Sequence, residues 1–367
     1  NAGIPVVGTS YESMMIADDR GSFSRLMEQL GLVQSENRTA CTREAVISCA
    51  EEVGYPVLLR PSHVLGGRNM EIVYDVDQLR SYLAGDVIIG DSHPILVDHF
   101  LEDAFEYDLD AVSDGKSIYI GGILQHIEAA GIHSGDSAAV YPPFASKPEI
   151  LQQMREASLA IAQSLRIVGF MNIQFAVQHD RLYVIEVNPR ASRTVPFISK
   201  MSEVDLVDAA VRIWEGESLV SQHLVTHEGG IGEGTCQFGW AVKEAVFSFD
   251  RFIDMDPQLG PEMRSTGEVI GIGSTFGEAF AKSQIASGND LPIKGSVCIS
   301  VNKRDRDAVI PLARALQELG FELTATRGTA RDLFAAGIVC ETVLKTDEGN
   351  PNILDHMNNG RIDLLIN

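Results

Sequence analysis

The sequence predicts an α+β domain followed by a small α/β domain with a parallel sheet. Over residues 55–187, short strand patterns follow one another or flank a helix, the order of a mixed fold with antiparallel strands. From residue 296 the pattern becomes strand, helix, strand and helix, which is typical of a parallel sheet. A chain of 367 residues with 45% hydrophobic content can form two or three domains, each with its own core.

The individual elements follow from apolar spacing and from glycine and proline positions. Apolar residues recur at helical spacing over 18–30, where Gly31 ends the pattern, and again over 42–53. The apolar run 57–59 and a strand at 70–74 are expected to form a hairpin. One further helix is expected at 149–165, and further strands are expected at 95–100, 105–112, 117–124, 171–177 and 181–187.

Two breaks precede the second domain. The glycine-rich residues 222–236 are interpreted as a flexible insert, and no function is assigned to their core, 228–234. Residues 286–294 form a second, polar break. The expected elements after it are a strand at 296–301, a helix at 305–319, a strand at 321–326 and a helix that opens at 328–329.

The composition excludes several classes of partner. The formal charge is −22, from 51 acidic and 29 basic residues, so the chain lacks the clustered positive charge that binds a nucleic acid polymer. No apolar run reaches the roughly 20 residues of a membrane span. The five cysteines include no CxxC pair, which predicts a reducing, cytoplasmic compartment. Neither terminus resembles a natural chain end, so we expect a piece of a longer protein.

A candidate metal site lies on two consecutive strands. Glu186 and Asn188 alternate along one strand and therefore face the same side, with Arg190 just beyond, while Gln174 lies on the preceding strand. One carboxylate and two amide oxygens suit Mg²⁺, which prefers oxygen ligands and retains waters and substrate phosphates. A surface strand with alternating polar residues would give the same pattern.

Candidate phosphate contacts lie beside the expected hairpin. Gly66 and Gly67 allow backbone N–H groups to approach a polyphosphate, although such a pair is also common in ordinary turns. Arg60, at the end of an apolar strand, is placed to hold phosphate oxygens in a bidentate manner.

Three further features have open interpretations. The small, polar segment 131–137 either folds over a ligand or is a structural loop. His126 and Glu128 either shape a substrate pocket or lie at the surface. His99 is interpreted as a core or rim histidine with no role as a general base.

Several longer segments carry a resemblance to a known family. They are ADDRGSF (17–23), YPVLLRPSHVLGGRNMEIVYD (55–75), LVDHFLEDAFEYDLDA (96–111), GGILQHIEAAGIHSGDSA (121–138), MNIQFAV (171–177), VIEVNPRASRTVPFISK (184–200) and GPEMRSTGEVIGIG (260–273). Together they resemble the large subunit of carbamoyl phosphate synthetase over essentially the whole chain. VLGGRNMEIVY and the appended small domain are similar to the C-terminal, carbamoyl-phosphate half, whereas the first half activates bicarbonate.

The resemblance implies a fold and a division into domains. An α+β ATP-grasp fold, in which two lobes enclose ATP and two Mg²⁺ or Mn²⁺ ions, would be followed by a small α/β, methylglyoxal-synthase-like allosteric domain. The implied regions are an ATP-grasp domain at 1–220, a connecting region at 221–290 and an incomplete allosteric domain at 291–367.

The resemblance also implies roles for individual residues. The implied nucleotide contacts are those of the phosphates (Arg20, Arg60, Gly66, Gly67), the adenine (His99, Leu101), the ribose (Glu106) and an adjacent loop (Gly131, Ile132, His133, Ser134). Gln174 and Glu186 would hold one metal ion and Glu186 and Asn188 the other, with Arg190 facing the transferred phosphoryl group. The implied effector contacts are Arg306, Thr326, Thr329 and Lys345, with Asn367 at the start of the remaining phosphate loop.

The implied reaction is the ATP-dependent phosphorylation of carbamate to carbamoyl phosphate. In the family this is the last step of a glutamine-dependent synthesis that serves pyrimidine and arginine formation. The implied partners are the N-terminal half of the same subunit, a glutamine amidotransferase small subunit and a nucleotide effector such as UMP or IMP. Arg306 stands where the family often has lysine, which leaves the effector open. Two alternatives remain: another ATP-grasp carboxylate ligase, and a nucleotide-binding regulatory fragment without turnover.

Overall fold

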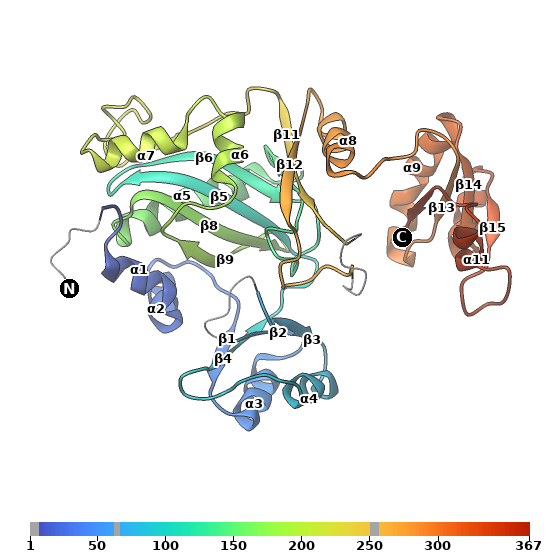
Figure 1. The fold of residues 1–367 in the computed structure, drawn as a ribbon, viewed down its shortest axis with the longest axis horizontal. Coiled ribbons are helices and arrows are strands. Elements are labelled where there is room, and N and C mark those ends of the chain that lie inside the picture. The colour runs from blue at the N-terminus through green and yellow to red at the C-terminus, as the bar shows by residue number, and fades with distance from the viewer. Residues whose placement is uncertain (1–6, 62–66, 250–256) are drawn as a thin grey trace. The chain divides into compact units, whose positions relative to one another are not determined.

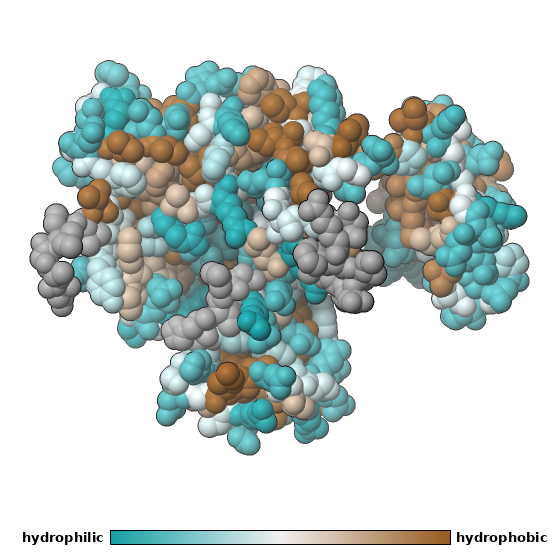
Figure 2. All heavy atoms as spheres, in the orientation of Figure 1, coloured by the Kyte–Doolittle hydropathy of each residue, from teal (hydrophilic) through white to brown (hydrophobic). Residues whose placement is uncertain are grey.

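The computed structural model describes residues 7–61, 67–249 and 257–367, and the chain divides into two compact units, Asn1–Gly288 and Asn289–Asn367. The first unit contains two sheets and the second contains one. Hydrophilic residues cover most of the face of the molecule drawn in Figure 2, with hydrophobic residues in smaller groups between them. No helix within the described residues is long and apolar enough to cross a membrane.

The smaller sheet of the first unit has the strand order β1-β4-β2-β3 and is covered by two helices, α3 and α4 (Figure 1). Its elements are β1 (Asn37–Ala40), α3 (Arg43–Val53), β2 (Val57–Pro61), β3 (Glu71–Val73), α4 (Val76–Ala84) and β4 (Ile95–His99). Helix α3 buries Val46, Ala50 and Val53, which share one helical face, against this sheet. The predicted hairpin is confirmed, because β2 pairs antiparallel with β3.

The larger sheet has eight strands in the order β12-β11-β7-β6-β5-β8-β9, with β10 paired to β6. The strands are β5 (Phe105–Asp114), β6 (Ile118–His126), β7 (Ala139–Tyr141), β8 (Val168–Gln178), β9 (Arg181–Asn188), β10 (Ile231–Glu233), β11 (Trp240–Val246) and β12 (Gly267–Gly273). The helices are α1 (Tyr11–Asp18), α2 (Arg20–Gln29), α5 (Pro148–Ser164), α6 (Val195–Met201), α7 (Leu206–Trp214) and α8 (Phe276–Ser287).

Helices cover both faces of the larger sheet (Figure 1). One core contains apolar side chains of α2 and α5, and a second contains those of α6 and α7. Successive residues of β5, β6 and β8 point to opposite faces of the sheet, so each strand contributes apolar side chains to both cores.

Two sequence predictions differ from the structure. The expected helix 18–30 is two helices, because Asp19 has extended backbone dihedrals and accepts a hydrogen bond from Ser22 N at 2.8 Å, which caps α2. The stretch 222–236, interpreted as a flexible insert, contains β10, which runs parallel to β6. A Cβ atom at Gly232 would lie 1.9 Å from Leu224 O, so glycine here permits a close backbone approach.

The second unit has a four-stranded sheet in the order β15-β14-β13-β16, and every pair is parallel. Its elements are β13 (Ser296–Ile299), α9 (Arg306–Glu318), β14 (Glu322–Thr326), α10 (Arg327–Ala335), β15 (Glu341–Val343), α11 (Ile353–Asn358) and β16 (Leu364–Ile366). The predicted parallel sheet is confirmed. Buried residues of α9 and α10 form a core with β13 and β14.

Candidate functional site

A cavity that is open to solvent lies between the two sheets of the first unit. Strands β2 and β4 of the smaller sheet form one wall, and β8 and β9 of the larger sheet contribute to the other. The lining residues are Arg20, Gln34, Ser35, Asn37, Leu58, Arg60, Asp98, His99, Phe100, Leu101, Glu106, Ala130, Gly131, Ala176, Val184 and Ile185.

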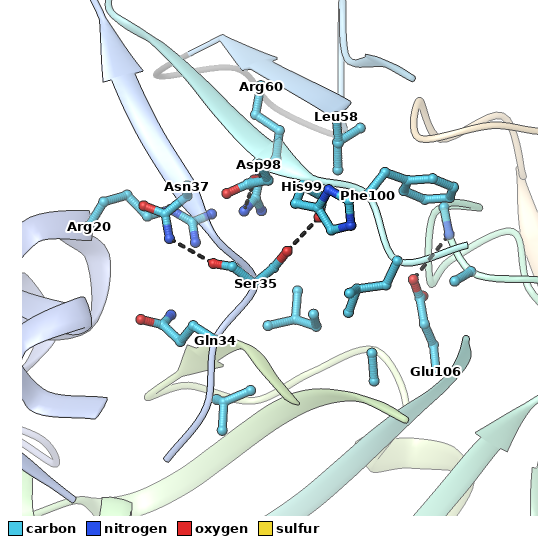
Figure 3. A pocket seen from close by; sticks show the side chains of 16 residues that line it. Arg20, Gln34, Ser35, Asn37, Leu58, Arg60, Asp98, His99, Phe100 and Glu106 are labelled. Carbon is cyan, nitrogen blue, oxygen red and sulfur yellow. Dashed lines mark hydrogen bonds and ion pairs between the residues drawn. The ribbon is translucent and has the colours of Figure 1, made fainter. Parts of the chain in front are cut away.

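Positive charge gathers at one end of this cavity. Figure 3 shows Arg20 and Arg60 there, beside Asp98. The Nε and Nη2 atoms of Arg60 lie 2.6 and 2.5 Å from one carboxylate oxygen of Asp98. Burial lowers the pKa of the Arg20 guanidinium, and the neighbouring charge of Arg60 lowers it further. The two guanidinium groups are placed to hold an anionic group such as phosphate at this end of the cavity.

The other end of the cavity is apolar, with a carboxylate at its edge. Leu101 is buried there with Ala104 and Ala176, and His99 Nδ1 donates a hydrogen bond to Gly54 O at 3.1 Å. Glu106 lies away from the two arginines in Figure 3, and its Oε1 accepts a hydrogen bond from Gly131 N at 3.1 Å. Apolar walls with a few polar atoms at the edge are typical of nucleotide and cofactor sites.

Six polar residues form two rows across three neighbouring strands of the larger sheet, and we call them the polar rows. In the strand order β5, β8, β9 the rows are Asp108–Gln174–Glu186 and Asp110–Asn172–Asn188. The residues of each strand are two positions apart, so all six side chains lie on one face of the sheet. The structure therefore brings together Gln174, Glu186 and Asn188, which the sequence placed on two strands.

Hydrogen bonds connect the two rows. Asn188 Nδ2 donates to Glu186 Oε1 at 2.8 Å and to Asn172 Oδ1 at 3.4 Å. Arg190 Nη2 donates to Asn188 Oδ1 at 3.3 Å, which brings the exposed Arg190 to the same site. Gln174 Nε2 donates to Asp108 Oδ1 at 3.3 Å. Glu186 and Asn188 thus lie at the β9 end of the rows, and Gln174 lies next to Glu186.

This donor set fits Mg²⁺ or Mn²⁺. Both ions accept carboxylate and amide oxygens and complete their coordination with water and substrate phosphates. Within residues 7–61, 67–249 and 257–367, no group of three or more His, Cys, Asp or Glu side chains could hold a metal ion. A site with a single carboxylate, which depends on phosphate oxygens for further ligands, agrees with that finding.

A buried ion pair lies behind the rows. His126 Nε2 is 2.9 Å from Asp108 Oδ2, and His126 Nδ1 is 3.5 Å from Glu106 Oε2. Burial alone would lower the pKa of His126, but the hydrogen bonds and charges of Asp108 and Glu106 raise it to about 9. Burial likewise opposes ionisation of Asp108, yet the hydrogen bond from His126 holds its pKa below the usual value. Its two carboxylate neighbours thus favour the charged form of His126. Because His126 is buried, the surface location considered for it is wrong.

The pKa of Asp110 is shifted in the opposite direction to that of Asp108. Burial and the adjacent Asp108 charge raise the pKa of Asp110 to about 6. Its Oδ1 accepts a hydrogen bond from Asn172 Nδ2 at 3.1 Å, and its other oxygen accepts one from the Thr194 hydroxyl. Both of its carboxylate oxygens thus have a hydrogen-bond partner.

The segment 131–137 is joined to a remote segment, 260–266. His133 N donates to Gly260 O at 2.9 Å, and the two carboxylate oxygens of the buried Asp136 accept from Arg264 N at 2.7 Å and Ser265 N at 2.8 Å. Gly131 lines the cavity, whereas Ile132, His133 and Ser134 are not among its lining residues. Ser134 O accepts a hydrogen bond from the buried Lys243 at 3.1 Å.

Gly67 lies against the same remote segment. Its φ is +72°, and a Cβ atom there would be 2.0 Å from Pro261 O, so the close approach requires glycine. The other glycine of the pair, Gly66, lies outside the described residues.

In the second unit, the expected effector residues lie toward the carboxyl ends of parallel strands. Thr326 ends β14, Lys345 follows β15 and Asn367 follows β16, so all three lie at the same edge of the sheet. Thr329 is buried in α10, and its Oγ1 accepts a hydrogen bond from Val301 N at 3.4 Å. Arg306 pairs with Asp332 through a 3.1 Å contact and leaves its Nε without a partner.

Sequence reasoning missed four polar residues of the first unit: Asp98, Asp108, Asp110 and Asn172. A pattern for three of them was visible. Glu106, Asp108 and Asp110 alternate within an otherwise apolar strand, and Asn172 precedes Gln174 with the same spacing. Polar residues that face one side of a buried strand need partners, so the alternation indicates a functional or structural cluster.

Comparisons with known proteins agree with this architecture. The family model described as "Carbamoyl-phosphate synthase L chain, ATP binding domain" matches residues 19–222. A second, described as "MGS-like domain", matches residues 308–367. The carbamoyl phosphate synthase large chain of Acidobacterium capsulatum is 48% identical over 369 residues, which cover 100% of this chain and 33% of that protein. The large chain of Pasteurella multocida is 48% identical over 365 residues, which cover 100% of this chain and 34% of that protein.

This chain therefore spans about a third of the length of these curated relatives. A solved structure shows the fold. The biotin carboxylase domain of 2-oxoglutarate carboxylase from Hydrogenobacter thermophilus, in complex with MgADP, ADP and bicarbonate, has a TM-score of 0.56 and 16% identity. The match covers 74% of this chain and 65% of that one. The first unit thus has an ATP-grasp fold of the biotin carboxylase type, followed by a small parallel-sheet domain.

Proposed function

Because the chain belongs to the family of carbamoyl-phosphate synthase large-chain ATP-binding domains, an ATP-grasp ligase family, we propose that it phosphorylates carbamate with ATP. The products are carbamoyl phosphate and ADP. A carbamate oxygen forms a bond to the γ-phosphorus, and the bond between that phosphorus and the departing ADP oxygen breaks. The observation that carries this proposal is the electrostatic interaction between Glu186 of the polar rows and Arg20, which lies with Arg60 at the charged end of the cavity.

Different residues of the chain bind the adenine, the ribose and the phosphates in this reaction. The apolar end of the cavity holds the adenine, with His99 and Leu101, and Glu106 accepts hydrogen bonds from the ribose. Arg20 and Arg60 bind phosphate oxygens at the other end. Arg190 stabilises the charge on the transferred phosphoryl group, since phosphoryl transfer depends mainly on positioning and on neutralising charge.

Glu186 holds both metal ions, Gln174 contributes to one and Asn188 to the other. When bound, the ions neutralise phosphate charge and orient the phosphates. Gly67 and the segment 131–137 cover the nucleotide and exclude water from carbamate, which hydrolyses easily. Ile132, His133 and Ser134 belong to this cover.

The family also suggests the parent subunit, its partners and the use of its product. We propose that the chain is the C-terminal, carbamoyl-phosphate half of a cytoplasmic large subunit that acts with an N-terminal half and a glutamine amidotransferase small subunit. Its product would serve pyrimidine and arginine synthesis. The second unit would bind a nucleotide effector such as UMP or IMP at the sheet edge that carries Thr326, Lys345 and Asn367. The domains are proposed at 1–220, 221–290 and 291–367.

The reverse partial reaction tests the proposal. The chain is incubated with ADP, Mg²⁺ and carbamoyl phosphate, and ATP formation is measured by a coupled assay. We expect ATP to form, and to require carbamoyl phosphate. A folded chain that binds ADP but forms no ATP would contradict the proposal and favour a regulatory fragment. ATP formation from another acyl phosphate alone would favour a different carboxylate ligase.

A further inference from the structure

The carboxylates of the polar rows determine which way the neighbouring amide groups point. An ionised carboxylate accepts hydrogen bonds and cannot donate one, whereas an amide has a donating and an accepting end. Wherever an amide meets a carboxylate, its nitrogen must therefore face the carboxylate. Its oxygen must then face the opposite way.

Asp108 is the carboxylate that meets two of these amides. Its Oδ1 accepts from Gln174 Nε2 at 3.3 Å and from Asn172 Nδ2 at 3.4 Å. Its Oδ2 is 2.9 Å from His126 Nε2. Asp108 is only 4% exposed, so water cannot substitute for these partners. The amide nitrogens of Asn172 and Gln174 are therefore directed toward Asp108.

The orientation of Asn172 is compatible with only one orientation of Asn188. Because the nitrogen of Asn172 faces Asp108 and Asp110, its Oδ1 faces β9 and accepts from Asn188 Nδ2 at 3.4 Å. Asn188 Nδ2 also donates to Glu186 Oε1 at 2.8 Å. The remaining atom, Asn188 Oδ1, lies 3.3 Å from Arg190 Nη2 at the open end of the rows. Every amide in the chain of contacts thus has one allowed orientation.

We propose that Asp108 is a positioning residue that directs the carbonyl oxygen of Gln174 toward the metal ions and, together with Asp110 and Glu186, that of Asn188. This inference rests on the proposed function, which makes Gln174 and Asn188 metal ligands. Asp108 itself does not contact metal or substrate. Its effect is exerted through the two amides, since an amide that presents its nitrogen to a cation cannot be a ligand.

The variant Asp108→Asn tests this role. Asparagine has nearly the same shape, but its amide can donate to Gln174 Oε1 and so permits the reversed orientation. Mn²⁺ binding to the full 367-residue chain is measured by electron paramagnetic resonance in the presence of a non-hydrolysable ATP analogue. We expect the Mn²⁺ dissociation constant of D108N to rise about 10- to 100-fold, the usual effect of losing a partner of a metal ligand. Metal-free ADP affinity should change much less.

A matched control and a designed rescue separate positioning from general damage. Asp114→Asn makes the same change at the far end of β5, where Asp114 accepts from Leu219 N, and should leave Mn²⁺ affinity unchanged. The double variant D108N/Q174E exchanges donor and acceptor at the 3.3 Å contact and conserves the total charge. A carboxylate at position 174 presents an oxygen to the metal in either orientation. We expect the double variant to bind Mn²⁺ at least about tenfold more tightly than D108N.

The outcomes separate the inference from the proposed function. If the wild-type chain binds no Mn²⁺ with the nucleotide, the proposed metal site is wrong and the inference falls with it. If wild type binds Mn²⁺ and D108N binds it equally well, the inference alone is overturned. A folded D108N/Q174E chain that binds Mn²⁺ no better than D108N would also overturn it. Should D108N fail to fold by circular dichroism, wild-type-like Mn²⁺ binding by the double variant supports the inference, and its loss contradicts it.

Discussion

Removing the Glu106 side chain should weaken nucleotide binding much more than it slows phosphoryl transfer. The carboxylate lies at the apolar end of the cavity, away from Arg20 and Arg60 (Figure 3). In Glu106→Ala the ribose loses a charged acceptor, and Gly131 N loses the oxygen at 3.1 Å. Gly131 is half-buried, so water can replace that contact, and His126, which loses its 3.5 Å contact with Glu106, keeps the shorter one with Asp108. The loss to the nucleotide therefore dominates.

The expected loss of nucleotide affinity equals the contribution of one charged hydrogen-bond acceptor. Such a bond contributes about 1.5–3 kcal/mol, which corresponds to a roughly 10- to 150-fold higher dissociation constant for MgADP. The maximal rate of the reverse reaction should fall less than the apparent affinity, because the ribose is remote from the transferred group. Calorimetric titration gives the dissociation constant, and the coupled assay gives the rate.

The matched control is Glu102→Ala, which removes an exposed glutamate close to the start of β5. It should leave both quantities unchanged. The variant Glu106→Gln keeps an acceptor for Gly131 N but loses the charge, and should fall between wild type and Glu106→Ala. A Glu106→Ala dissociation constant within twofold of wild type would show that the carboxylate does not contact the nucleotide.

Three further predictions concern the metal site, an ion pair and pH. Glu186→Gln removes the carboxylate shared by both ions, so the rate of the reverse reaction should fall by about 10²–10³-fold with the fold retained. Asp98→Asn leaves Arg60, whose side chain is 16% exposed, without its partner, and should lower the free energy of unfolding in urea by about 2–4 kcal/mol. Burial and the charge of Glu128 raise the pKa of Glu244 to about 7, so this group's contribution to stability is lost as pH rises from 4.5 through 7. After allowance for solvent screening, wild type should lose roughly 1–2 kcal/mol more stability than Glu244→Gln between pH 5 and 8.

Each of these predictions can fail on its own. Full activity of Glu186→Gln at limiting Mg²⁺ would place the metal site elsewhere. Unfolding curves of Asp98→Asn that coincide with those of wild type would show that the pair with Arg60 adds no net stability. Parallel pH profiles for wild type and Glu244→Gln, followed by thermal unfolding, would show that Glu244 ionises normally in the folded chain.

Local patterns were sufficient where a structural feature depends on neighbours in the sequence. The alternation of Glu186 and Asn188 placed both side chains on one face, and the structure agrees. The β2–β3 hairpin and the parallel sheet of the second unit were also predicted from short patterns. In each case the period of the apolar residues determines the element.

Features that depend on strand register could not be predicted in the same way. Asp108 and Gln174 are 66 residues apart, and they meet because β5 pairs antiparallel with β8 in one register. The pair of Arg60 and Asp98 likewise depends on the alignment of β2 with β4. The stretch that contains Gly232 was misread because glycine allows both flexibility and close backbone packing, and only the neighbouring chain distinguishes them.

The carboxylate of Asp136 has a consequence for local unfolding. It accepts hydrogen bonds from two consecutive amides, Arg264 N and Ser265 N, which lie 128 and 129 residues further along the chain. Those amides can exchange their hydrogens with solvent only after these contacts break. Native-state hydrogen exchange at residues 264 and 265 should therefore follow the opening of the 131–137 segment, and the two stretches should behave as one cooperative unit despite their separation in sequence.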